Sequence, residues 1–227
     1  MANILLTTNC NLACTYCFAQ EKMEGLPRQS MSMENVARLI EFLKASNYPA
    51  FRMMGGEPTL HPNFGEIAAQ VLDQGFRIDL LSNATWSPRY NDLFGRISPN
   101  RILFLLNIDH PDNYLPKQWA QIQNNLSTLS RDGKKVTLSF NIFERKPRYQ
   151  YIFDLTQKYN IHMIRMSFSL PVLGEKNAYL PFEDYVHLSS FIVDFVREAE
   201  AIGVKVRLDN ALPLCIFTYE QAGELIL

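Results

Sequence analysis

The chain has no surplus of charge of either sign. Its 227 residues include 22 lysines and arginines against 23 aspartates and glutamates, a net charge of −1. This balance does not indicate a nucleic-acid partner or an anionic membrane surface. No stretch approaches the roughly 18 apolar residues that span a bilayer, and residues 1–8 lack the basic start and apolar core of a signal peptide. We therefore expect a cytoplasmic protein without membrane association.

Cysteine is scarce, which argues against a disulfide framework. The chain has four cysteines, and three of them fall within "CNLACTYC", as Cys10, Cys14 and Cys17, with Cys215 far away. Disulfide-built proteins are small and carry cysteines throughout the chain. In a reducing compartment, thiols gathered in one short segment more often hold a metal.

The rest of the sequence alternates between strand-like and helix-like segments. Residues 101–108 are apolar almost throughout, as is typical of a strand buried on both faces. Alternation of this kind predicts an α/β fold of six or seven βα units, with a parallel sheet, helices outside it and right-handed connections. It leaves open whether the sheet forms an incomplete barrel or a doubly wound layer. The predicted strands are 3–8, 50–54, 76–82, 101–108, 135–143, 161–170 and 204–208, and the predicted helices include 32–46, 63–74, 148–159 and 182–202.

The cysteine segment directly follows the first predicted strand, where loops of such folds perform chemistry. Thiolates bind zinc, copper(I) or iron–sulfur clusters. A structural zinc site needs four protein ligands, so His61 or Cys215 would have to complete it. Three thiolates on one loop suit a cubane cluster with one iron left open, unlike the usual ligation by four cysteines. The third alternative is ordinary buried thiols.

A second segment, "MMGGEPTLHP", follows the second predicted strand. Its two glycines permit a close backbone approach or positive φ angles. The loop could offer carbonyl groups and the Glu57 carboxylate to an ammonium group. The alternative is a plain glycine turn with a surface glutamate.

Together the two segments resemble the radical S-adenosylmethionine (radical SAM) enzymes. That family has C-x3-C-x2-C after its first strand, with an aromatic residue before the last cysteine, and Gly-Gly-Glu-Pro after its second. The resemblance implies a partial (β/α)6 barrel of the TIM type. It also implies that Cys10, Cys14 and Cys17 each bind one iron of a 4Fe–4S cluster, and that S-adenosylmethionine chelates the fourth iron through its amino and carboxylate groups. One electron from the cluster would cleave the sulfonium and give a 5′-deoxyadenosyl radical that abstracts hydrogen from a substrate.

The resemblance extends to further cofactor-binding positions. Gly55, Gly56 and Glu57 would hold the methionyl ammonium group, and Tyr16 would lie near the adenine. "SNA" stands where relatives often have "TNG", so Asn83 alone transfers from that motif. "NIDH" stands where peptide-modifying relatives have "SLDG", which suggests a ribose contact for Asn107, and Asn141 is a further candidate facing the cavity. For Asn107 and Asn141 the alternative is a hydrogen-bonded amide at a strand end.

The resemblance also bears on domains, substrates and partners. We assign residues 1–210 to the radical SAM core, and 211–227 to a C-terminal segment that would begin a cysteine-rich (SPASM- or twitch-like) extension. There Cys215 would be an auxiliary cluster ligand or a hydrogen donor, or else a buried thiol. A peptide or protein substrate is favoured over a small metabolite, with a flavodoxin- or ferredoxin-like electron donor. An alternative of another class is a non-catalytic zinc or electron-transfer domain.

Overall fold

A single parallel sheet organises the part of the chain that the structure describes. The computed structural model describes residues 3–19, 27–172, 174, 176–209 and 212–226. Within them, seven strands pair in the order of the sequence, and each neighbouring pair is parallel. The strands are β1 (Ile4–Leu5), β2 (Ala50–Met54), β3 (Arg77–Ser82), β4 (Ile102–Asn107), β5 (Lys135–Ile142), β6 (Met163–Phe168) and β7 (Lys205–Leu208).

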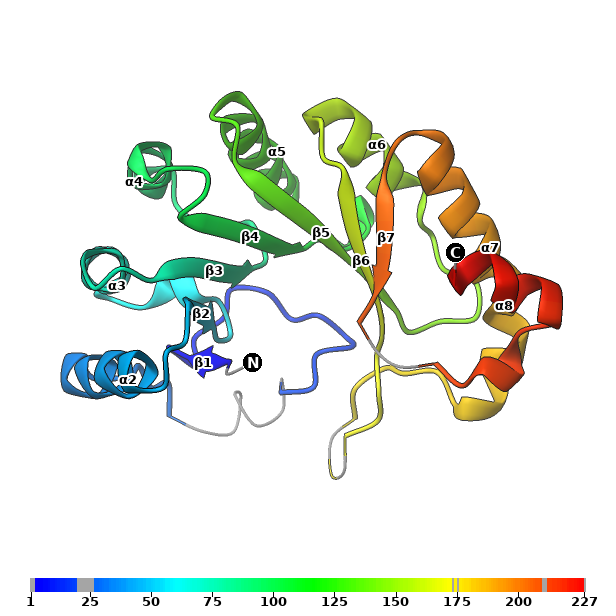
Figure 1. Ribbon diagram of the computed structural model, residues 1–227, viewed down its shortest axis with the longest axis horizontal. Coiled ribbons are helices and arrows are strands. Elements are labelled where there is room, and N and C mark those ends of the chain that lie inside the picture. Colours follow the sequence, from blue (N-terminus) through cyan, green and yellow to red (C-terminus); the bar gives the residue numbers. More distant parts are fainter. Residues whose placement is uncertain (1–2, 20–26, 173, 175, 210–211, 227) are drawn as a thin grey trace.

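The helices lie on one side of this curved sheet, as Figure 1 shows. They are α2 (Met33–Ala45), α3 (Phe64–Asp73), α4 (Arg89–Arg96), α5 (Pro116–Arg131), α6 (Gln150–Tyr159), α7 (Tyr185–Ala201) and α8 (Tyr219–Ile226). β1 and β7 stand at opposite ends of the strand order, so the sheet does not close. The predicted partial barrel is therefore confirmed. None of these helices is long and apolar enough to cross a membrane.

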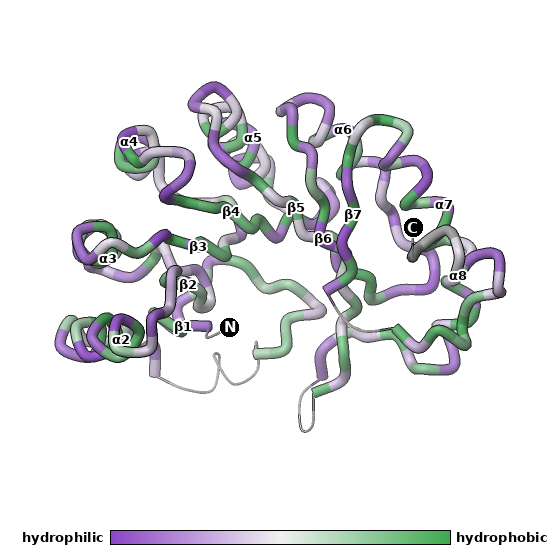
Figure 2. Tube along the Cα trace, in the orientation of Figure 1, coloured by the Kyte–Doolittle hydropathy of each residue, from purple (hydrophilic) through white to green (hydrophobic). Residues whose placement is uncertain are grey.

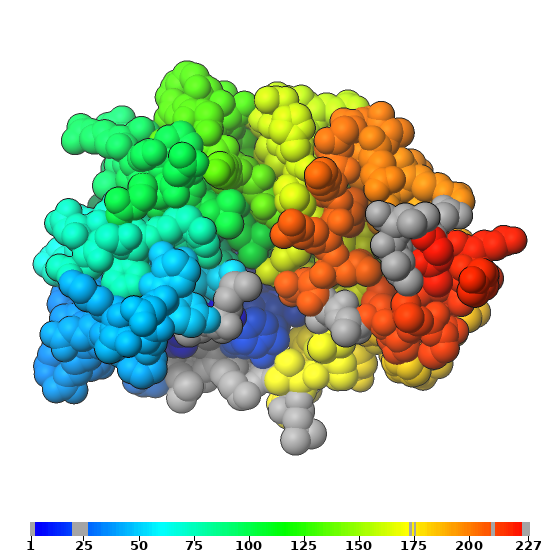
Figure 3. All heavy atoms as spheres, viewed as in Figure 1, coloured from blue at the N-terminus to red at the C-terminus, as the bar shows by residue number. Residues whose placement is uncertain are grey.

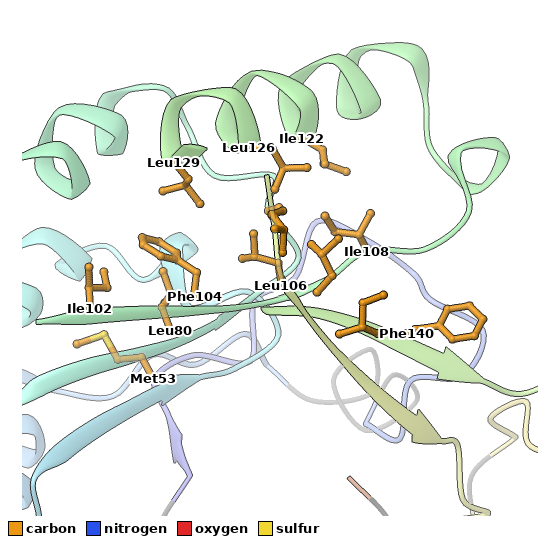
Figure 4. Packing of buried hydrophobic residues seen from close by; sticks show 14 of the residues in the cluster. Met53, Leu80, Ile102, Phe104, Leu106, Ile108, Ile122, Leu126, Leu129 and Phe140 are labelled. Atoms are coloured by element: carbon orange, nitrogen blue, oxygen red, sulfur yellow. The ribbon is translucent and has the colours of Figure 1, made fainter. Parts of the chain in front are cut away.

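The hydrophobic core fills the layer between the sheet and the helices. Figure 2 shows hydrophobic residues along the central strands, while hydrophobic and hydrophilic positions alternate around the helices. In Figure 4, Leu126 and Leu129 of α5 lie above Phe104 and Leu106 of β4. All four are at most 1% exposed, so they form part of a close-packed interior.

The prediction that residues 101–108 are buried on both faces was wrong. Along β4, buried residues alternate with partly exposed ones. Phe104 and Leu106 face the helices, whereas Leu105 and Asn107 line a cavity on the inner face. A strand of an incomplete barrel has one face on the packed layer and one on the interior, so uniform apolar character did not mean uniform burial.

Several helix boundaries follow from local chemistry. Ser32 caps α2, since its hydroxyl accepts a hydrogen bond from Asn35 N at 3.2 Å. Asn160 ends α6 in a left-handed conformation with φ of 53°, which asparagine tolerates better than most residues. The C-terminal segment forms α8, where Gln221 donates to Ser190 Oγ of α7 at 3.2 Å. Its assignment as a separate unit stays a prediction.

The contribution of the outer layer can be measured at Phe104. This side chain is 0% exposed and contacts the rings of Trp86 and Phe94. Phe104→Ala should lower the free energy of unfolding by about 3–5 kcal/mol, because it leaves a cavity among aromatic rings. Urea unfolding measures the change. The control is Phe42→Ala, at a site that is 64% exposed, where the loss should stay within about 1 kcal/mol. Equal losses at both positions would contradict this account of the core.

Candidate functional site

One large cavity lies at the carboxyl edge of the sheet, on its inner face. It has a volume of about 480 Å³, within the usual size range of small-molecule sites. Its walls come from the loop after β1, the loop after β2, and the inner faces and ends of β3 to β6. Nine residues predicted for the site line it: Cys10, Cys14, Tyr16, Cys17, Gly55, Gly56, Asn83, Asn107 and Asn141.

The loop after β1 spans the opening between the end of β2 and the end of β6. In the space-filling view it (dark blue) lies between the side built around β2 (light blue) and the side built around β6 and β7 (yellow and orange) (Figure 3). On the far side it is held by Ala178 N, which donates to Thr15 O at 2.8 Å, and by Ser169 Oγ, which donates to Tyr16 O at 3.3 Å. The cysteine loop therefore forms one wall of the cavity.

On the near side, the cysteine loop is packed directly against the glycine loop. Gly56 N donates to Thr7 O at 2.9 Å, and Glu57 N donates to Asn9 O at 2.7 Å. A Cβ atom on Gly56 would lie 2.4 Å from Asn9 O, and one on Gly55 would lie 2.6 Å from Thr7 O. The two glycines thus permit a backbone approach that any side chain would prevent.

The three clustered cysteines are free thiols of intermediate burial. Burial raises the pKa of Cys10, and burial together with the Asp109 carboxylate raises the pKa of Cys14 to about 12. Binding a metal must therefore displace their protons. The described residues contain no group of three or more His, Cys, Asp or Glu that could hold one metal ion. A cluster does not require one, since each thiolate binds a different iron.

A row of polar side chains crosses the cavity wall from Tyr16 to β6. Asn107 Nδ2 donates to Tyr16 Oη at 2.9 Å. Asn141 Nδ2 donates to Asn107 Oδ1, and Ser167 Oγ donates to Asn141 Oδ1. Burial raises the pKa of the Tyr16 phenol. The two asparagines are therefore hydrogen-bonded strand-end amides, and their side chains also face the cavity.

Glu57 does not line the cavity. Its carboxylate is fully buried and accepts hydrogen bonds from Thr59 N, Thr59 Oγ1, Ser82 Oγ and Asn83 N, at 2.6 to 3.2 Å. Burial raises the pKa of Glu57, and the donors oppose that shift. Every partner donates, so the ionised carboxylate satisfies them all. In this structure, Glu57 ties the glycine loop to the end of β3.

The loop after β3 places Asn83 beside the cysteine loop. Asn83 Nδ2 donates to Asn11 Oδ1 at 3.0 Å, and Asn11 Nδ2 donates to Thr85 Oγ1 at 2.8 Å. Ala84 follows, and its φ of 63° lies in the left-handed region. That conformation costs a non-glycine residue about 1–2 kcal/mol, so the surrounding contacts hold this turn in place.

Six polar cavity residues were missed in the sequence: Ser139, Arg165, Ser167, Ser82, Ser169 and Asp209. The first three sit at alternate positions of otherwise apolar strands, and this period of two was the available signal. Cys215 is exposed, beside α8, and is not among the cavity residues. The structure does not bring it to the three clustered cysteines, and its role stays a prediction.

The close approach of the two loops can be tested with Gly56→Ala. The added methyl group would meet backbone atoms at 2.4 and 2.6 Å, which should lower the free energy of unfolding by about 2 kcal/mol or more. The control is Gly65→Ala in α3, where a Cβ meets nothing within 4 Å. That change should raise stability by about 0.5–1 kcal/mol, because alanine favours the helix. Urea unfolding measures whether each change lowers or raises the free energy of unfolding. A neutral Gly56→Ala would show that the loops do not need this approach.

Glu57→Ala tests the buried carboxylate. It leaves four donors without their acceptor, so the free energy of unfolding should fall by about 3 kcal/mol. Glu41→Ala, on the exposed side of α2, should change it by less than about 0.5 kcal/mol. Thermal and urea unfolding of the metal-free protein measure both changes in the free energy of unfolding. If Glu57 served only as a counter-charge for a bound ammonium group, its removal would leave this stability unchanged.

The residues at the site suit the cofactors that the sequence predicts. Three free thiols and two glycines without side-chain bulk face one cavity of adequate volume. Thiolates are the preferred ligands of iron–sulfur clusters. The main chain of the glycine loop lies beside them, within reach of a ligand bound there.

Comparisons with known proteins agree with the predicted resemblance to radical SAM enzymes. A family model described as the Radical SAM superfamily matches residues 4–142, which is more than half of the chain. The S-adenosylmethionine-dependent nucleotide dehydratase of Selenomonas ruminantium is 33% identical over 84 residues, covering 37% of this chain and 29% of that protein. The GTP 3',8-cyclase of a Synechocystis species is 29% identical over 164 residues, covering 68% and 48%.

Among solved structures, Streptococcus suis SuiB bound to S-adenosylmethionine superposes with a TM-score of 0.73 at 15% identity, over 91% of this chain and 49% of SuiB. This likeness shows a shared fold. The chain thus spans less than half the length of each of these proteins. With the match over residues 4–142, the chain belongs to the radical SAM superfamily.

Proposed function

We propose that this chain is the catalytic core of a radical SAM enzyme, which cleaves S-adenosylmethionine reductively at a 4Fe–4S cluster. The observation that carries the proposal is that three free thiols and the glycine loop line one cavity. When bound, the two cofactors supply a 5′-deoxyadenosyl radical that takes hydrogen from a substrate. The difficult chemistry belongs to them, and the chain's own residues bind, orient and shield.

Binding begins at the two loops. Cys10, Cys14 and Cys17 hold the cluster, and each thiol gives up its proton to do so. The main-chain carbonyls of Gly55 and Gly56, which line the cavity, would hold the methionyl ammonium group. Glu57 has its oxygens committed to four protein donors, so in this proposal it fixes the shape of the loop and does not contact the ammonium group.

Orientation comes from the polar row between Tyr16 and Ser167. The side chains of Asn107 and Asn141 are held by one another and by their neighbours. They therefore meet a ribose or methionyl group at low entropic cost. Asn83, fixed by Asn11, supports the same ligand from β3. The apolar side chains of the cavity exclude water; they include Leu12, Met54, Leu81, Leu105 and Phe168.

The first candidate substrate is a peptide or protein. It is supported by the fold shared with SuiB, which has also been solved bound to a precursor peptide, SuiA, and which superposes in that form with a TM-score of 0.71 at 16% identity over 91% of this chain and 48% of SuiB. The second candidate is a small metabolite, because the two sequence relatives are named for nucleotide chemistry. A flavodoxin- or ferredoxin-like donor supplies the electron, and the cytoplasm is the expected location.

The decisive experiment measures 5′-deoxyadenosine. The protein is loaded anaerobically with iron and sulfide, then mixed with dithionite and S-adenosylmethionine. We expect a brown protein that forms 5′-deoxyadenosine. Single changes of Cys10, Cys14 or Cys17 to alanine should each abolish the colour and the product, because each thiolate binds one iron.

Two outcomes would reject the proposal. A brown protein without product above background would be an electron carrier, and a colourless protein that binds zinc would be a structural metal domain. Cys215→Ala serves as the matched cysteine change for iron content. Its thiol is exposed and lies outside the cavity, so the bound iron should not fall. A loss of iron would make Cys215 a fourth ligand.

A further inference from the structure

Two neighbouring polar residues on the inner face of the sheet have no role in the proposed cofactor site. Ser139 of β5 and Arg165 of β6 are directly opposite each other in the strand register. Both line the cavity. Asn107 of β4 is paired with Ser139 on the other side, so the pair continues the row of inward-facing polar residues away from the cofactor loops.

Both residues hold a buried polar atom without a partner. Among the described residues, Ser139 Oγ and Arg165 Nε are buried and make no hydrogen bond. The Ser139 side chain belongs to a residue that is only 1% exposed. Such atoms are rare because each costs the desolvation of a polar group. Two of them side by side, both donors and both on a cavity wall, indicate that an acceptor binds between them.

The charges around the pair favour an anion. The nearest ion-pair partner of Arg165 is Asp209, with Nη2 and Oδ2 separated by 3.6 Å, which is longer than a hydrogen bond. Burial lowers the pKa of Arg165, the nearby charge of Arg52 acts in the same direction, and Asp209 only partly offsets them. An anionic oxygen group at Arg165 would offset this partly buried positive charge and accept a hydrogen bond from the buried Nε–H.

Ser139 and Arg165 lie deeper in the barrel than Asn141 and Ser167, the neighbouring residues of the polar row. Ser139 precedes Asn141 by two residues on β5, and Arg165 precedes Ser167 by two residues on β6, so the pair lies farther from the carboxyl edge than the polar row that meets the cysteine loop. A parallel strand rises about 3.3 Å per residue, so this offset is about 7 Å. In the proposed site, the three clustered cysteines and the glycine loop would hold the cluster and the methionyl end of S-adenosylmethionine at the carboxyl edge of the sheet. A group held by Ser139 and Arg165 therefore belongs to a second molecule.

We propose that Ser139 and Arg165 form a subsite for an anionic oxygen group, a carboxylate or a phosphate, of the substrate. The statement that this group is the substrate's rests on the proposed function. Arginine presents its N–H groups as a planar fork that fits carboxylate and phosphate oxygens, and the serine hydroxyl donates a further hydrogen bond. The subsite selects substrates that carry such a group, and it fixes their position on the β5–β6 wall of the cavity.

The test measures anion binding directly, without turnover. The protein is labelled with ¹⁵N-arginine, and the Nε–H resonance of Arg165 is assigned by its absence in Arg165→Met. Acetate and inorganic phosphate are then titrated separately into the protein, both before and after cluster loading. We expect the Arg165 resonance to shift saturably with one or both anions, and the tighter probe identifies the group that the substrate carries.

Variants separate binding from folding. Arg165→Met lacks the reporter resonance, so isothermal titration calorimetry measures its anion affinity. That affinity should be roughly tenfold or more weaker, as expected for the loss of hydrogen bonds to a charged group. Ser139→Ala should weaken it severalfold while leaving the melting temperature unchanged or higher, because it removes an unpartnered hydroxyl. A purely structural serine would not give this combination. The matched control is Arg207→Met, since Arg207 pairs with Arg165 in the register of β7 but does not line the cavity.

Three results would overturn the proposal. The first is no saturable shift of Arg165 with either anion. The second is equal anion affinity in the wild-type protein, Arg165→Met and Ser139→Ala. The third is complete loss of anion binding when S-adenosylmethionine is present, which would assign the pair to the cofactor's carboxylate. None depends on 5′-deoxyadenosine formation, so failure here is distinguishable from failure of the radical SAM proposal.

Discussion

The contact between the glycine loop and the cysteine loop is the constraint on which the site depends. Gly56 approaches so closely that a Cβ atom would lie 2.4 Å from Asn9 O, and two main-chain hydrogen bonds join the loops there. β1 pairs with β2 through only two residues in each strand. The cysteine loop is therefore positioned less by its own strand than by this approach, which brings the thiols and the glycine main chain to the same cavity wall.

Much of the fold could be predicted from the sequence, because alternating apolar segments determine which residues face the helices. The parallel sheet with outer helices follows from that alternation. The site was predictable where a motif names its residues, as for Cys10, Gly56 and Asn83. The alternation could not reveal which face of 101–108 borders open space. That depends on the failure of the sheet to close, which is a property of the whole chain.

The position of Glu57 shows a second limit of sequence reasoning. In the sequence it is an acidic residue beside glycines, which suits an ammonium ligand. In the structure it is fully buried, and Ser82 and Asn83 at the end of β3 donate to it. Those donors are 25 and 26 residues away, and only the parallel pairing of β2 with β3 brings them together. The structural role of the Glu57 carboxylate therefore depends on tertiary contacts that the local sequence does not reveal.

The two faces of the sheet divide stability and function between them. The helix-facing side chains, such as Phe104 and Leu106, are apolar and fully buried, so they supply the packing that holds the strands in register. The cavity-facing positions of the same sheet carry amides, hydroxyls and a guanidinium, which add little to that packing. Adjacent residues on one strand can therefore be selected for opposite purposes without conflict, because they point to opposite faces of the sheet. This is why the sheet tolerates unpartnered polar atoms at Ser139 and Arg165. Packing of the helix-facing layer offsets the free energy lost by desolvating them, so the inner face can carry the side chains that a ligand requires.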